Sequence, residues 1–467
     1  MSNANNCVTL SAIMEKQGKL QELETRPVGR LLLDYSLPAI VGMVVMSLYN
    51  VIDRIFIGQG VGSEAIAGLA ITFPVMNLSA AIGILIGAGA AARISILLGA
   101  KNQRSAEMVL GNALVMILIN AVVYIAIFAI FIDEILIAFG ASNASLPHAR
   151  DFMQWMLPGM LLMNVMFSFN SIMRSSGYPR KAMITMFISA GINVILAPIF
   201  IFGLDWGIKG AAIATDIAVA ISTFFVMRHF VKKSSNLHFT PGTYRLKWAI
   251  VASIIAIGAA PSVVNAAGSA INVIINTSLF KHGGDSAVAA AGIFTTYTSL
   301  LTTIVVGLCQ GMQPIIGYNY GAGRFDRLKR TYWIAVAVAT IITTAGGIIG
   351  LLCPSYIASA FTIDANLINA TVNGLSISLM AFWMVGFQIV STTFFQSIGK
   401  AGKSIFLSLT RQVLFIIPLL LILPTHFKLD GVWASFPTSD VFATIATTIM
   451  IWWEFRLISR ASTPVEI

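Results

Sequence analysis

Long apolar runs recur along this chain from Leu31 to Trp453, separated by short polar or charged segments. Each run is close to the roughly 20 residues that an α-helix needs to cross a bilayer. The pattern predicts an all-α integral membrane protein with twelve transmembrane helices. The expected spans are residues 35–57, 65–90, 106–131, 151–173, 183–203, 208–228, 249–276, 286–310, 331–353, 369–397, 404–424 and 431–454.

An internal repeat divides these spans into two halves. Asn50-Val51-Ile52 recurs as Asn272-Val273-Ile274, an offset of 222 residues that also relates Gly99-Ala100 to Gly321-Ala322. Six spans per half give both halves the same orientation, so we expect two pseudo-symmetric six-helix lobes around a central cleft. The expected divisions are a cytoplasmic N-terminal tail or interfacial helix (1–27), an N-lobe (28–230), a basic cytoplasmic linker (231–247), a C-lobe (248–456) and a cytoplasmic C-terminal tail (457–467).

Charge supports the membrane assignment and orients the chain. Only 10% of residues are charged, against about 25% in soluble domains. The net charge of +10 arises mainly from Lys and Arg in the even-numbered connections. By the positive-inside rule these connections and both termini are expected to be cytoplasmic. We therefore expect no nucleic-acid partner, and almost no basic residue in the middle of the membrane.

Signatures of hydrolases and metal sites are missing from the sequence. It has no HExxH or Walker A pattern, its five His residues are scattered, and its three Cys are widely spaced. An integral-membrane enzyme, which we considered as an alternative class, would need a cluster of acids, His or metal ligands. We expect no enzymatic activity, no cofactor and no metal centre, so any transport would draw energy from an ion gradient.

Asp53, near the end of the first span, is the first candidate functional residue. A charge at hydrocarbon depth is costly and persists mainly for function. A carboxyl group in low dielectric favours its protonated form, so Asp53 could carry a proton, or it could ligate Na⁺ together with neighbouring oxygens. The structural alternatives are an ion pair with Arg54 or a hydrated position near the outer surface.

Several motifs together resemble the MATE family of multidrug and toxic compound extrusion transporters, in its DinF-like prokaryotic branch. The resemblance covers residues 27–455 and rests on Gly311–Ala322, Gly386–Gln388, Phe395–Lys400 and Gly431–Asp440, with Arg174–Lys181 and Gly210–Thr215 in the first half. It implies a bacterial inner-membrane protein that exports amphipathic, often cationic compounds, driven by entry of H⁺ or Na⁺.

The resemblance also implies roles for particular residues. Asp53 matches the coupling acid of the first span, and Asn170, Asn193 and Thr215 match its partners on spans four, five and six. The second acid of the family would fall at Ala197, which can neither titrate nor ligate. Our hypothesis is that Asp216, one residue after Thr215, supplies that carboxylate, and the alternative is that Asp53 acts alone.

A second polar site is expected in the C-lobe. Its candidates are Asp440, Gln388, Gln396 and Asn272. Asp440 could be a proton site, a counter-charge for cations or a hydrogen-bonding group between helices. Candidates for the substrate cavity are Met46, Tyr49, Phe73, Asn77, Met163, Met166 and Tyr297, because Met adapts to varied ligands and aromatic faces attract cations.

The function predicted from these observations is a secondary active efflux antiporter in which two lobes rock to give alternating access. Its expected partners are small organic substrates and membrane lipids, and a two-lobed chain forms its cleft as a monomer. The alternative is a flippase or exporter of a lipid-linked or endogenous metabolite. That function predicts a cleft with several Arg or Lys to hold phosphate.

Overall fold

The computed structural model describes residues 20–60, 63–142, 145–232 and 235–462, and these are almost entirely helical, without a strand. Apolar residues at hydrocarbon depth favour helices because a helix satisfies its backbone hydrogen bonds internally. The N-lobe contains α2 (Val28–Gly60), α3 (Ser63–Gly99), α4 (Gln103–Ala138), α5 (Leu146–Ser175), α6 (Pro179–Pro198) with its π-helical extension η1 (Ile199–Gly203), and α7 (Gly207–Val231).

The C-lobe repeats this arrangement with more interruptions. It contains α8 (Trp248–Gly321), α9 (Phe325–Leu352), α10 (Pro354–Ser359), α11 (Ala365–Ser378), α12 (Trp383–Ser397), α13 (Ala401–Leu409), the π-helix η2 (Thr410–Phe415) and α14 (Ile416–Ser462). Non-helical backbone at Gly284 (φ 66°) and Lys428 (φ 50°) breaks α8 and α14 into two arms each. The helices α11 and α12 form one span bent by 60°.

The described helices account for the twelve expected spans. Nine helical segments within the described ranges are long and apolar enough to cross a membrane, and the bent pair makes ten. Two of these ten, Trp248–Gly321 and Ala401–Arg460, each hold two arms, which completes the twelve. The all-α, two-lobed fold predicted from the sequence is therefore confirmed.

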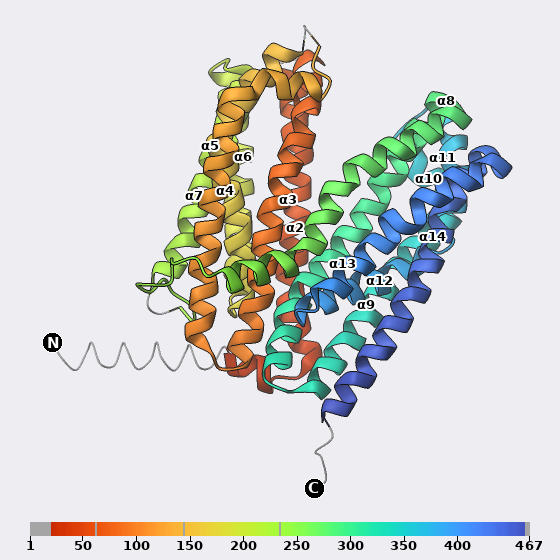
Figure 1. Ribbon diagram of the computed structural model, residues 1–467. Coiled ribbons are helices and arrows are strands. Elements are labelled where there is room, and N and C mark those ends of the chain that lie inside the picture. The colour runs from red at the N-terminus through yellow and green to blue at the C-terminus, as the bar shows by residue number, and fades with distance from the viewer. Residues whose placement is uncertain (1–19, 61–62, 143–144, 233–234, 463–467) are drawn as a thin grey trace.

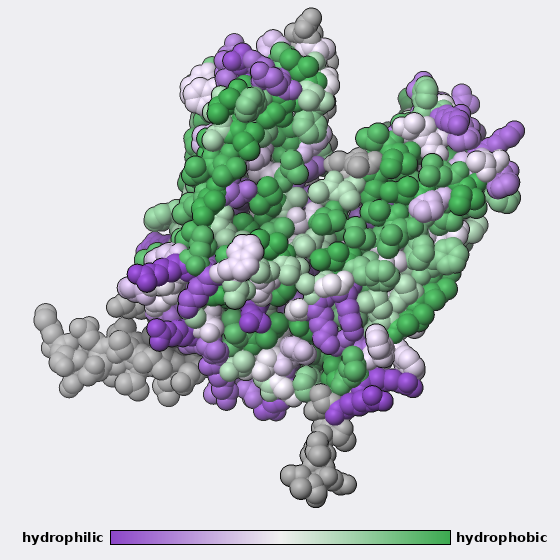
Figure 2. Space-filling model, in the orientation of Figure 1, coloured by the Kyte–Doolittle hydropathy of each residue, from purple (hydrophilic) through white to green (hydrophobic). Residues whose placement is uncertain are grey.

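The two lobes form a V (Figure 1). We call the end where α2 begins and α14 ends the base, and the opposite end the open end. The lobes meet at the base and diverge toward the open end, where Figure 2 shows a cleft between them. On the face seen in Figure 2, apolar side chains cover a broad band of both lobes, with polar residues gathered at the base and at the tips.

Glycines let the lobes approach closely near the base. A Cβ at Gly99 on α3 would lie 2.0 Å from the carbonyl oxygen of Tyr318 on α8. Reciprocally, a Cβ at Gly321 on α8 would lie 2.0 Å from the carbonyl oxygen of Ile96 on α3. Both pairs of equivalent residues differ by the repeat offset of 222, so the contact obeys the pseudo-twofold relation between the halves. Small residues at such interfaces let helix backbones pack tightly in a membrane.

The start of the described chain is fastened to the C-lobe at the base. Residues 20–25 are helical, whereas residues 1–19 of the expected N-terminal tail or interfacial helix lie outside the described residues. Glu24 forms an ion pair with Arg324 at 2.6 Å. Arg327 donates to the carbonyl oxygens of Leu23 and Arg26 at 3.2 and 2.7 Å. These bonds tie the segment before α2 to the α8–α9 turn.

One buried side chain of α4 holds the last residues of the inter-lobe linker. Asn112 on α4 is fully buried. Its amide nitrogen donates to the carbonyl oxygens of Thr243 and Arg245, each at 3.1 Å, and its oxygen accepts from the backbone N–H of Lys247 at 2.9 Å. One asparagine thus satisfies three backbone groups of a segment that lacks regular structure.

Candidate functional site

A polar network lies inside the N-lobe, in the half nearer the open end. Its centre is the hydroxyl of Thr215 on α7, which accepts a hydrogen bond from Nδ2 of Asn193 on α6 at 2.8 Å. The same hydroxyl lies 3.4 Å from that of Tyr49 on α2 and donates to the Ala211 carbonyl at 3.0 Å. All three side chains are buried. The network therefore joins three helices of the N-lobe through groups whose oxygens can also accept a hydrogen bond from a protonated carboxyl group or coordinate a cation.

Two carboxylates flank this network. Asp53 lies one turn from Tyr49 on α2 and is half-buried, and both Asp53 and Asp216 lie within electrostatic range of the Tyr49 hydroxyl. Asp216 follows Thr215 on α7 and is also half-buried. The structure thus brings together four of the five residues expected for ion coupling: Asp53, Asn193, Thr215 and Asp216. It also adds Tyr49, which the sequence suggested only for the substrate cavity.

Asp216 occupies a space that a glycine leaves open. A Cβ at Gly159 on α5 would lie 1.6 Å from Oδ1 of Asp216, so no other residue type fits there without moving the carboxylate. The backbone of Gly159 lies within hydrogen-bonding reach of this carboxylate, and no side chain of the described residues donates to its buried Oδ1. The sequence alone did not single out Gly159.

The fifth expected residue, Asn170, lies elsewhere. Its Nδ2 donates to the Ala182 carbonyl at 2.7 Å and to the Thr185 hydroxyl at 2.9 Å, and its oxygen accepts from Arg174. Thr185 precedes Asn193 by eight residues on α6, which is about 12 Å along a helix. Asn170 thus belongs to a separate cluster nearer the base, beside a buried arginine. Ala197, where the family pattern has an acid, is fully buried among apolar side chains.

The C-lobe site contains a charge that the sequence analysis overlooked. Asp440 on α14 is buried, and its Oδ1 accepts a hydrogen bond from Nε of Arg411 on η2 at 2.8 Å. The expectation of almost no basic residue within the spans is therefore wrong at Arg411. A charged residue between 404 and 424, read beside Asp440, was the available signal. Arg411 therefore supplies one basic side chain of the kind that a phosphate-bearing cargo requires.

The other expected residues of the C-lobe site divide into two groups. Gln388 on α12 donates to the Asp440 carbonyl and to the Thr444 hydroxyl, each at 2.7 Å. Asn272 lines the same cavity of about 190 Å³ as Arg411 and Asp440. Gln396 is buried eight residues further along α12, about 12 Å toward the base. The structure therefore groups Asn272, Gln388 and Asp440 and leaves Gln396 apart.

The expected substrate-cavity residues are also dispersed. Met166 is buried in the main apolar core, with Met163 packed against it. The Tyr297 hydroxyl donates to the Gly346 carbonyl at 2.7 Å within the C-lobe. Phe73 is 47% exposed, and Met46 and Asn77 are half-buried. Among these described residues, Tyr49 contacts the polar network, whereas Met163, Met166 and Tyr297 pack within their own lobes.

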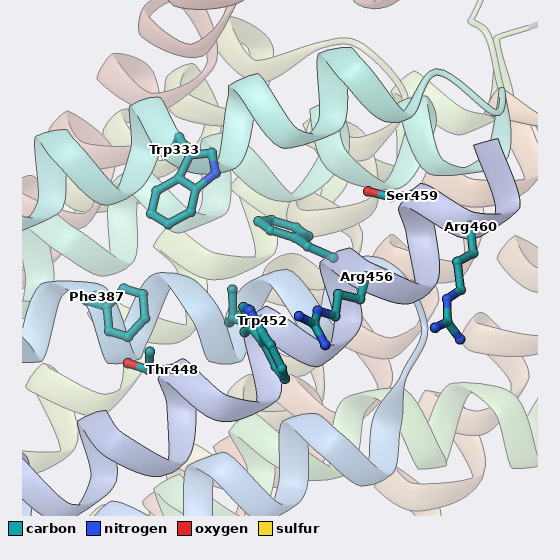
Figure 3. Close-up of a pocket in the computed structure, with 9 residues that line it drawn as sticks. Trp333, Phe387, Thr448, Trp452, Arg456, Ser459 and Arg460 are labelled. Atoms are coloured by element: carbon teal, nitrogen blue, oxygen red, sulfur yellow. The ribbon is translucent and has the colours of Figure 1, made fainter. Parts of the chain in front are cut away.

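A larger groove lies on the outside of the C-lobe, away from both polar sites. Its volume is about 540 Å³, and Trp333, Phe387, Trp452, Arg456 and Arg460 are among its lining residues (Figure 3). The Arg456 guanidinium lies 3.6 Å from the centre of the Trp452 ring. Aromatic and basic side chains at the end of a membrane helix are typical of the membrane interface. Neither Asp53 nor Asp216 of the N-lobe is among the residues that line this groove.

The chemistry available to the N-lobe network follows from its groups. Carboxylate, amide and hydroxyl oxygens bind Na⁺ or hold a proton, and they are the hard ligands that such cations prefer. Among the described residues, no group of three or more His, Cys, Asp or Glu side chains could hold a metal ion. The network is thus suited to reversible binding of a proton or a monovalent cation.

Comparisons with known proteins agree with this architecture. The model of the MatE family matches twice, at residues 38–199 and 261–422, so the two matches begin 223 residues apart, one residue more than the offset found from the motifs. A relative called "FAD transporter" from Shewanella oneidensis is 28% identical and covers 91% of this chain and 94% of its own length. "Multidrug export protein MepA" of Staphylococcus aureus is 26% identical over 94% of this chain and 96% of its own.

Solved structures show the same fold. The MATE multidrug transporter DinF-BH, solved as a complex with a ligand, superimposes with a TM-score of 0.84, is 36% identical, and covers 92% of this chain and 96% of its own. An outward-facing multidrug resistance MATE transporter of the MOP superfamily gives a TM-score of 0.88 at 24% identity, with 94% and 98% coverage.

Proposed function

Since this chain belongs to the MatE family of multidrug efflux transporters, we propose that it is a secondary antiporter. It exports amphipathic, often cationic organic compounds in exchange for H⁺ or Na⁺. The N-lobe network couples the ion, and rocking of the two lobes alternates access to the cleft. The relatives are named for transport and not for catalysis, which agrees with a protein that is not an enzyme.

One observation carries the proposal. Two half-buried carboxylates, Asp53 and Asp216, flank a buried network of Tyr49, Asn193 and Thr215 on three helices of one lobe. Acids in membrane spans are expensive and are retained chiefly along ion pathways. When the lobe rearranges, hydration of the network changes, and the carboxylates take up or release a proton or Na⁺. An organic cation competes with that ion for the same negative charge.

The orientation follows from the charges at the base. Arg324 and Arg327 bond to the segment just before α2, and Lys400 and Lys403 pair with Glu454 near the end of α14. By the positive-inside rule this end faces the cytoplasm of a bacterial inner membrane. The cleft then opens outward, as expected for an exporter that has just released its cargo and is ready to receive the coupling ion. The chain acts as a monomer.

The test is efflux of a fluorescent lipophilic cation from proteoliposomes under an imposed H⁺ gradient or an imposed Na⁺ gradient. We expect one gradient to drive transport, and Asp53→Asn and Asp216→Asn each to abolish the driven component. Asp285→Asn is the matched control, because Asp285 is exposed at the turn between the two arms of α8. Full gradient-driven transport in both network variants would refute the assignment of this site.

A second candidate function is export of an endogenous metabolite or a lipid-linked cargo. Two findings favour keeping it: the half-buried Arg411 in the C-lobe, paired with Asp440, and the relative named for FAD, a molecule that bears phosphates. If folded protein transports organic cations under neither gradient, these cargoes are the next to test in the same vesicles.

A further inference from the structure

The C-lobe contains a built site that the coupling mechanism does not use. Arg411 lies on η2, a stretch of π-helix inside a membrane-spanning segment. Such wide turns are rare and occur frequently at functional sites. The side chain of Arg411 is 29% exposed, whereas that of Asp440 is only 7% exposed. A charged pair kept at this depth marks a pathway or binding site more often than a structural contact.

The cavity beside the pair is lined by polar groups that can donate hydrogen bonds. Asn272, Asn276, Thr295 and Ser299 are exposed where the cavity opens. Arg411 and the more deeply buried Asp440 line it further in. The first arm of α8, which carries Asn272 and Asn276, runs along the edge of the C-lobe that faces the N-lobe (Figure 1). A molecule in the cleft therefore has access to these groups.

The geometry of the ion pair leaves most of the arginine donors available. Arg411 uses Nε for its bond to Asp440 at 2.8 Å, and neither Nη nitrogen bonds to a described residue. A guanidinium group has five N–H donors, and its Nη fork binds carboxylate or phosphate oxygens in a bidentate manner. Asp440 thus holds the guanidinium in place without covering the face best suited to an acidic ligand.

We infer that the C-lobe cavity binds an acidic group of the cargo, a carboxylate or a phosphate, through the Nη fork of Arg411. The inference rests on the proposed export function, which it deepens by naming a class of cargo. The two lobes then have opposite charge preferences, with acids in the N-lobe for a cation and an arginine in the C-lobe for an anion. At about 190 Å³ the cavity holds the acidic group and the adjoining carbons, while the rest of the molecule extends into the cleft.

Equilibrium binding to the full-length protein in detergent tests this inference without requiring transport. The probes are a cationic rhodamine ethyl ester and its free acid, which has the same rings and a carboxylate in place of the ester group. Fluorescence polarisation gives a Kd for each, and the ratio of ester Kd to acid Kd measures recognition of the carboxylate. This binding assay uses no ion gradient. A ratio that does not respond to the variants would therefore count against this inference without bearing on the proposed ion coupling.

The two members of the ion pair must change this ratio in opposite directions. Arg411→Gln removes the positive charge and the Nη fork and leaves Asp440 negative, so the ratio should fall about tenfold or more, the size of a lost charge-assisted hydrogen bond. Asp440→Asn frees the guanidinium, so the ratio should rise. Arg411→Lys, which keeps the charge but lacks the fork, should give an intermediate ratio.

A purely structural ion pair predicts a different result. Both variants would then change the binding of ester and acid by equal factors, and the ratio would stay at the wild-type value, which would overturn the inference. The double variant Arg411→Gln/Asp440→Asn, which leaves no uncompensated charge, keeps the test valid if a single variant folds poorly. Competition by benzoate or by phenyl phosphate then shows which acidic group the site prefers.

Discussion

The reciprocal glycine contact near the base makes a quantitative prediction about lobe movement. In Gly321→Ala the new Cβ would lie 2.0 Å from the carbonyl oxygen of Ile96, whereas ordinary contact begins at 3.4 Å. The obstacle is helix backbone, so no rotamer change relieves it, and α3 and α8 must separate locally by about 1.4 Å. Overpacking of this kind costs about 1–3 kcal/mol.

This cost falls on the state in which the base is closed. In a rocking transporter the alternative state separates the lobes at the base, so it does not bear the clash. The ratio of base-closed to base-open molecules should therefore fall about 5- to 150-fold, since each 1.4 kcal/mol is a factor of ten. Gly99→Ala should act similarly, because the Tyr318 carbonyl lies at the same distance from its Cβ.

Spin labels at Ile137 and Ile363, which are exposed on the N-lobe and the C-lobe respectively, report the width of the open end. Pulsed electron–electron double resonance in nanodiscs measures the distance between the two labels, and the population with the longer distance should shrink in Gly321→Ala. Gly292→Ala on the same helix is the control, because a Cβ there meets nothing within 4 Å. An unchanged distance distribution in a folded Gly321→Ala protein would show that the glycine contact does not bias the lobes.

Two further predictions concern stability. Glu454 is fully buried and pairs with Lys400 at 2.5 Å and with Lys403 at 2.6 Å. Glu454→Gln should lower the free energy of unfolding by about 3 kcal/mol, the lower end for a broken buried ion pair, because both lysines are partly exposed. A melting temperature in detergent equal to that of the wild type would contradict this. Asn112→Ala leaves three backbone groups of the linker without their partner, so amide hydrogen exchange across residues 243–247 should become faster. Asn102→Ala, which removes the exposed N-cap of α4, is the control and should leave this exchange unchanged.

The sequence was sufficient for the architecture, for a physical reason that applies to any membrane protein. The thickness of the hydrocarbon layer dictates the length of each apolar run, and the absence of water dictates helices. The repeat of Asn50-Val51-Ile52 at Asn272 then revealed the two halves, and the paired family matches agree with it within one residue. Asp53 could be chosen in advance because an acid at hydrocarbon depth is costly, and Asn193 and Thr215 because the resemblance supplied their positions.

The structure alone decided which polar side chains meet and which do not. Asn170 bonds to Arg174 and Thr185 instead of joining Thr215, because its depth and direction depend on how α5 and α6 pack. Gly159 matters only because Asp216 projects onto it from α7. Arg411 meets Asp440, 29 residues away, because η2 packs against α14. Spacing along one helix predicts a face, but the partner on that face is set by tertiary packing.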